Sequence, residues 1–109
     1  MRLRARKDAN HNEIADFFIK CGATVADTSR LGDDFPDMVI ALCGFNVLVE
    51  VKDGSKPPSK SDLSKGQKKF QIEWRGWYVV IKSVDDALAL VGEIKQRQVS
   101  MLRGMKDAI

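Results

Sequence analysis

Two β-rich runs, at residues 38–42 and 47–51, constrain the fold of this chain more than any other feature. Both runs are almost entirely apolar, and the segment 44–46 (Gly-Phe-Asn) separates them, which predicts an antiparallel hairpin. If the chain turns at the first two residues of that segment, the numbers of paired residues add up to about 88–90. Residue 37 then lies across from residues 51–53, one strand spacing of about 4.8 Å away.

The remaining segments alternate between helical and extended patterns. The strand expected at 78–81 is wholly apolar, so we expect it to be central in its sheet and buried on both faces. The other expected elements are a helix over 9–21, a strand over 23–28, a helix over 63–76, and a helix from 83 onward that the tail 99–109 continues. The resulting order, αβββαβα, predicts an α/β fold in which helices flank a mixed central sheet.

Length and composition limit the class of protein. The chain has 109 residues, 18 Lys+Arg and 15 Asp+Glu, so we expect one domain over 1–109. No apolar window approaches about 18 residues, which argues against a membrane span or a secretory signal and predicts a cytoplasmic protein. The single histidine excludes zinc sites built on paired imidazoles, and we expect Cys21 and Cys43 to be reduced and buried.

Basic residues gather in two places. One cluster lies in the segment 53–66, whose composition is that of a loop, and in the helix expected after it. The other lies in residues 1–7. Such clusters suit a polyanion, because they neutralise phosphates and release counterions. The alternative is a solvated lysine-rich loop and a basic tail. The residues concerned are Lys56, Lys60, Lys65, Lys68 and Lys69, and Arg2, Arg4, Arg6 and Lys7.

Three charged residues converge at one end of the predicted hairpin. Glu50 and Lys52 share one face of their strand, about 6.6 Å apart along it, and Asp37 lies across the hairpin from them. Two carboxylates supply the hard oxygen ligands that Mg²⁺ prefers, and an adjacent lysine can orient or deprotonate a water or stabilise a phosphate. The simpler alternative is a charge pair at the sheet edge, with Asp37 as a cap or turn residue after Pro36.

The same residues resemble a known nuclease signature. Pro36-Asp37, twelve intervening residues and then Glu50-Val51-Lys52 resemble the PD-(D/E)xK superfamily, whose restriction-endonuclease-like core has the order αβββαβ. The chain resembles more narrowly the VRR-NUC (virus-type replication-repair nuclease) domain, especially its stand-alone phage members. The resemblance covers about residues 10–95 and leaves a basic N-terminal tail and a helical C-terminal extension. It also includes Gly32, Leu63-Ser64-x-x-Gln67 and Gly76-Trp77-Tyr78-Val79-Val80.

The resemblance implies a role for each matching residue. Asp37, Glu50 and the backbone carbonyl of Val51 would bind a divalent metal, Mg²⁺ or Mn²⁺, and Lys52 would be the catalytic lysine. Gln67 would lie near the active site, although Ser64-x-x-Gln67 is also a helix capping box. Glu13 matches the acidic residue that such nucleases often carry on the first helix, and the alternative for it is a solvated flank of that helix.

Together these observations predict a metal-dependent DNA endonuclease. The resemblance to resolvases implies branched DNA, Holliday junctions first, as the substrate and a homodimer as the working form. Arg30, in the loop that leads to the site, is a further candidate for contact with the DNA backbone. The alternatives are a flap or nonspecific nuclease of the same fold, and a nucleic-acid-binding module without catalysis.

Overall fold

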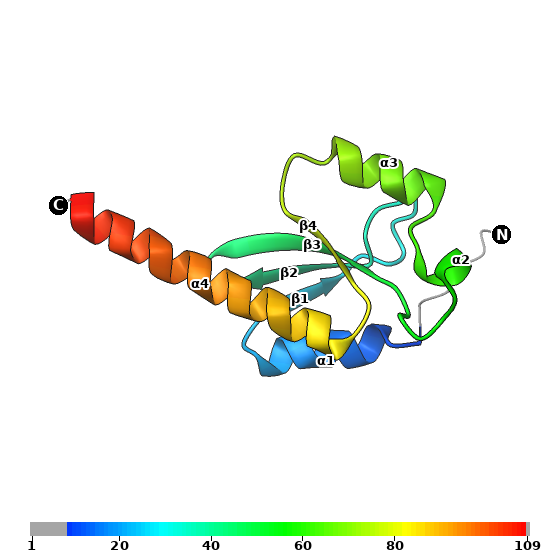
Figure 1. Ribbon diagram of the computed structural model, residues 1–109, viewed down its shortest axis with the longest axis horizontal. Coiled ribbons are helices and arrows are strands. Elements are labelled where there is room, and N and C mark those ends of the chain that lie inside the picture. Colours follow the sequence, from blue (N-terminus) through cyan, green and yellow to red (C-terminus); the bar gives the residue numbers. More distant parts are fainter. Residues whose placement is uncertain (1–8, 109) are drawn as a thin grey trace.

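The computed structural model describes residues 9–108 and has the expected order of main elements (Figure 1). A short helix, α2, lies in the lysine-rich segment whose composition predicts a loop. The elements are α1 (His11–Lys20), β1 (Thr24–Asp27), β2 (Met38–Leu42), β3 (Phe45–Val51), α2 (Pro58–Ser61), α3 (Lys65–Glu73), β4 (Tyr78–Ile81) and α4 (Val84–Ala108).

The four strands form one mixed sheet in the order β1-β2-β3-β4. The pairs β1–β2 and β2–β3 are antiparallel, and β3–β4 is parallel. This confirms the predicted α/β fold with a mixed sheet. The prediction that 78–81 is central and buried on both faces is wrong: β4 is an edge strand of this sheet and only Ile81 in it is buried. Its apolar character follows instead from the helices above and below it.

The sheet lies between helices on both faces (Figure 1). Helices α1 and α4 cover one face and bury the apolar core against it, which is the main stabilising contribution at about 1.5–3 kcal/mol for each large side chain. The opposite face carries α3. The core side chains of α1 and α4 are Ile14, Phe18, Ala87, Leu90, Val91 and Ile94, and those of the sheet include Met38, Ile40, Val47, Val49, Val51 and Ile81.

Aromatic contacts hold α3 over its face of the sheet. The ring of Phe70 lies 6.0 Å from that of Tyr78 on β4 and 5.6 Å from that of Phe35, which precedes β2. At the first turn of α3, a Cβ on Gly66 would overlap the carboxylate of Asp34. The glycine therefore lets the loop before β2 pack closely against the start of α3.

The hairpin turns one residue earlier than the sequence predicted. Cys43 and Gly44 both have positive φ, 53° and 84°, as the favoured two-residue hairpin turn requires. Phe45 therefore already belongs to β3, and Met38 pairs with Val49, so that paired numbers add up to 87. The expected sum of 88–90 is wrong. Continued by one residue, the observed register places position 37 opposite position 50, not opposite 51–53.

Helix α4 runs for 25 residues and confirms that the tail continues the last helix. Its C-terminal half extends beyond the sheet, and the molecule measures 56 × 28 × 27 Å (Figure 1). Across residues 9–108 no helix, α4 included, combines the length and apolar character needed to cross a membrane.

Candidate active site

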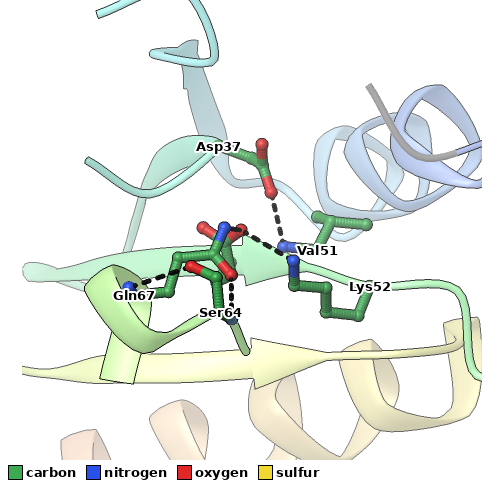
Figure 2. Close-up of polar contacts among 6 residues, drawn as sticks. Asp37, Val51, Lys52, Ser64 and Gln67 are labelled. Atoms are coloured by element: carbon green, nitrogen blue, oxygen red, sulfur yellow. Dashed lines mark hydrogen bonds and ion pairs between the residues drawn. The ribbon is translucent and has the colours of Figure 1, made fainter. Parts of the chain in front are cut away.

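The first carboxylate of the cluster lies where β2 begins. Oδ2 of Asp37 accepts a hydrogen bond from the backbone amide of Val51 at 2.8 Å (Figure 2). The backbone carbonyl of Asp37 accepts a hydrogen bond from the backbone amide of Thr28 at 2.9 Å. Asp37 is thus fixed between the loop after β1 and the end of β3. In Figure 2 its second carboxylate oxygen points away from the bond to Val51.

The second carboxylate, Glu50, is buried within β3, with only 3% of its surface exposed. The ammonium nitrogen of Lys52 lies 3.8 Å from Glu50 Oε1, and the amide of Gln67 donates to the same oxygen at 2.9 Å. A carboxylate so deep in a sheet is stable only with such partners, because uncompensated burial of a charge costs several kcal/mol. The alternation of side chains along β3 therefore places Glu50 and Lys52 together, as predicted.

Gln67 caps its own helix and also contacts Glu50. Its backbone amide donates to Oγ of Ser64 at 3.2 Å, and its Oε1 accepts from the backbone amide of Ser64 at 2.9 Å. This reciprocal pair is a capping box that starts α3. Because Nε2 of the same side chain reaches Glu50, the beginning of α3 sets the position of the buried carboxylate (Figure 2).

Tyr78 also belongs to this cluster, although its sequence pattern does not indicate it. Its hydroxyl is buried and has no hydrogen-bond partner among the described residues. Burial raises the pKa of the phenol far above its ordinary value, and the charges of Glu50 and Asp37 raise it further. Both carboxylates therefore act on one phenol. The signal for Tyr78 was weak, since an aromatic residue opening an apolar strand is ordinarily a core residue.

The raised pKa of Tyr78 predicts how stability depends on alkaline pH. An ordinary tyrosine titrates near pH 10, so below that value neither folded nor unfolded chains ionise and Tyr78 has no effect. Above it the unfolded chain loses the proton first, and the free energy of unfolding falls as pH rises. Tyr78 is the chain's one tyrosine. Tyrosinate absorbance is therefore expected to appear together with unfolding, and Tyr78→Phe should flatten the alkaline loss of stability. Tyrosinate in a still-folded protein near pH 10 would contradict the assignment.

Asn10, just before α1, is a second residue that the sequence did not reveal. Its side-chain amide donates to the carbonyls of Lys52 and Lys82, at 3.0 and 3.1 Å. These residues directly follow β3 and β4, so one side chain joins the ends of the two parallel strands beside the cluster. The contacts span 42 and 72 residues of chain, and no local pattern carries such information.

Glu13 takes a different place from the other predicted site residues. It is exposed on α1 and lines an open hollow together with Asp53, Lys82 and Asp85. Asp37, Glu50, Lys52 and Gln67 do not line that hollow. The hydrogen bonds and ion pairs known for residues 9–108 do not join Glu13 to the cluster. A role for Glu13 as a ligand therefore has no support from these contacts.

Only some of the residues predicted to bind phosphate lie on an element that contributes to the cluster. Lys65, Lys68 and Lys69 are exposed on α3, the helix that carries Gln67, and Lys69 lies 4.0 Å from Glu73. Lys56 is exposed in the loop after β3, and Arg30 is exposed in the loop before β2. The side chain of Lys60 and the basic residues of 1–7 lie outside the described part of the chain.

The donor set fits Mg²⁺ or Mn²⁺ better than a metal that needs a protein cage. Within residues 9–108 no three His, Cys, Asp or Glu side chains are grouped to hold a metal. Mg²⁺, in contrast, is usually bound through one or two carboxylates and keeps several waters or substrate oxygens. Asp37 and Glu50 can supply those two carboxylates. The structure shows the amide of Val51 in use, whereas coordination by its carbonyl stays a prediction.

Comparison with known proteins found no match to this chain. The chain matches no protein-family model, and neither the curated proteins nor the solved structures contain a match.

Proposed function

We propose that this protein is a divalent-metal-dependent endonuclease that hydrolyses phosphodiester bonds in DNA. The observation that carries the proposal is the buried Glu50, held by Lys52 and Gln67 at the end of the hairpin where Asp37 directly precedes the neighbouring strand. A chain selected for stability alone gains little from a charge at this depth, since apolar residues of similar volume serve as well or better. The free-energy cost of burying Glu50 is explained if its carboxylate has a chemical use.

Four residues of the cluster have a defined part in such a reaction. Asp37 and Glu50 would hold the metal, which when bound neutralises charge on the phosphate and lowers the pKa of a coordinated water. Lys52 is kept beside Glu50, where its ammonium can donate to the attacking water or to a phosphate oxygen in the transition state. Gln67 donates a hydrogen bond to the same oxygen of Glu50 and so fixes that side chain from α3.

DNA is the proposed substrate because α3, the helix that carries Gln67, also carries exposed lysines that can neutralise phosphates. The preference for branched DNA, Holliday junctions first, and the homodimer that would place two sites on a junction rest on the resemblance in the sequence alone. Flap and nonspecific cleavage use the same chemistry on other DNA shapes.

Removal of the α3 lysines is expected to weaken DNA binding and its salt dependence. Each phosphate contact contributes about 0.9 to the slope of log affinity against log salt, so Lys65→Gln, Lys68→Gln and Lys69→Gln together should reduce that slope by up to about 2.7. The loss should be similar for unrelated DNA sequences. Fluorescence anisotropy over a salt series measures both quantities. Lys20→Gln, on α1 across the sheet, is the control, and an unchanged slope in the triple variant would place the DNA elsewhere.

The function itself is tested with labelled four-way-junction, flap, linear duplex and single-stranded DNA in Mg²⁺, Mn²⁺ or EDTA. Paired symmetric nicks in the junction that need metal would support a dimeric resolvase. Metal-dependent cutting mainly of flaps or linear DNA would keep the chemistry and exclude the resolvase. Folded protein that binds DNA equally in EDTA and never cleaves it would favour the alternative of a catalytically silent binding module.

A further inference from the structure

The two halves of α4 have different surroundings. The first half packs on the sheet through Ala87, Leu90, Val91 and Ile94. One turn later the guanidinium of Arg97 lies over the ring of Trp77, 4.0 Å from its centroid. Beyond Arg97 the helix leaves the body of the molecule, and its full 25 residues span about 37 Å at 1.5 Å per residue (Figure 1).

Beyond that point the helix presents apolar side chains to solvent. Val99 is 40% exposed, and Met101, Leu102 and Met105 are 57–61% exposed. Met101 and Met105 follow the buried Ile94 at seven and eleven residues, so the stripe that contacts the core continues past the sheet. A helix segment of this length is marginally stable in water without packing. Such a stripe is typical of a helix face that contacts another protein surface.

The charges of α4 indicate which protein surface fits this apolar stripe. Residues 84–94 contain three acidic and no basic side chains, and residues 95–108 contain four basic and one acidic, so the halves carry −3 and +3. The acidic half also exposes one large apolar residue, Leu88, at 56%. Each half of α4 thus offers an apolar contact and the charge opposite to that of the other half.

We propose that two copies of this chain associate through α4, with the helices antiparallel. The basic, apolar C-terminal half of one copy lies along the acidic half of the other, and Leu102 approaches Leu88 of the second copy. A two-fold axis makes both contacts at once, as expected for an isologous dimer. A single helix pair is at the low end of interface sizes, below about 1,200 Å² in total, so the dimer dissociates on dilution. The resemblance in the sequence already implies a homodimer; the surface through which it forms is inferred here from α4 alone and does not depend on the proposed nuclease activity.

Sedimentation velocity of the full chain, without DNA or metal, tests the association. The wild type is expected to change from the mass of one chain to the mass of two as its concentration rises. Leu102→Glu should remain monomeric over the same range, with circular dichroism showing unchanged helix content. Ser100→Glu is the matched control, because it adds the same charge on the opposite face of the same helix. Monomeric wild type at every concentration, or equal dissociation of both variants, would overturn the proposal.

Cross-linking tests the direction of the helices. In a chain with Cys21→Ser and Cys43→Ser, copies carrying Leu88→Cys are mixed with copies carrying Leu102→Cys and oxidised mildly. The antiparallel arrangement predicts disulfides between the two kinds of copy and few between two copies of the Leu102→Cys chain. Efficient linking of Leu102→Cys to itself would exclude this arrangement, whatever the outcome of the cleavage experiments.

Discussion

Lys52→Met is expected to reduce DNA cleavage by at least about 10²-fold while DNA binding stays close to that of the wild type. The substitution keeps an unbranched side chain of similar volume but removes the ammonium that lies 3.8 Å from Glu50 Oε1. The phosphate binding proposed for the lysines of α3 does not need that group. Single-turnover cleavage and binding in EDTA measure the two effects separately.

Lys82→Met is the matched control for Lys52→Met. Lys82 follows β4 as Lys52 follows β3, since the last residues of the two strands, Ile81 and Val51, are paired. Its ammonium lies 3.8 Å from Asp62 instead of Glu50. Both variants should be compared below their melting temperatures, because Lys52→Met leaves a buried carboxylate with one partner fewer. Cleavage at the wild-type rate by Lys52→Met, or an equal loss in Lys82→Met, would remove Lys52 from the mechanism.

Glu50→Gln is expected to have opposite effects on the metal-free protein and on its response to metal. Without metal the free energy of unfolding should stay the same or rise, because a neutral amide costs less to bury than a carboxylate and still accepts the hydrogen bond from Gln67. With Mg²⁺ or Mn²⁺ the wild type should gain about 2.7 kcal/mol at a metal concentration near 100 times Kd, which corresponds to an increase of about 10 °C in Tm. Glu50→Gln should lose most of that gain and nearly all cleavage.

Thermal unfolding with and without metal measures the response of Glu50→Gln. Glu93→Gln provides the control, because Glu93 is exposed and pairs with Arg97 one turn away on α4, with 2.9 Å between the charged groups. Its metal response should match that of the wild type. A variant Glu50→Gln that is stabilised by metal as strongly as the wild type would show that the buried carboxylate is not a ligand.

The parts of the site that follow from local patterns could be predicted. Alternation along a strand is enough to place Glu50 and Lys52 on one face, and a capping box is enough to place Gln67 at the first turn of α3. The predicted register of the hairpin is wrong because the turn includes Cys43 with a positive φ, a conformation that residues other than glycine rarely adopt. Composition alone gave no reason to expect it there.

The parts that depend on distant contacts could not be predicted. Asn10 reaches the ends of β3 and β4 only after α1 packs against the sheet, and Tyr78 approaches the two carboxylates only because β4 lies parallel to β3. The helical pattern around Glu13 left its direction open, and the structure places it over a separate hollow. Tertiary arrangement, not local preference, decides these three positions.

The amide of Asn10 also has a consequence for how this protein opens. Proteins unfold locally in cooperative units, and a side chain shared by three segments makes those segments one unit. Detachment of α1 therefore removes, in the same event, the hydrogen bonds that the carbonyls of Lys52 and Lys82 accept from Asn10. Amide hydrogen exchange in α1 and at the ends of β3 and β4 should then proceed at a common rate. Local opening of the site is thus coupled to a helix that supplies none of the carboxylates of the site.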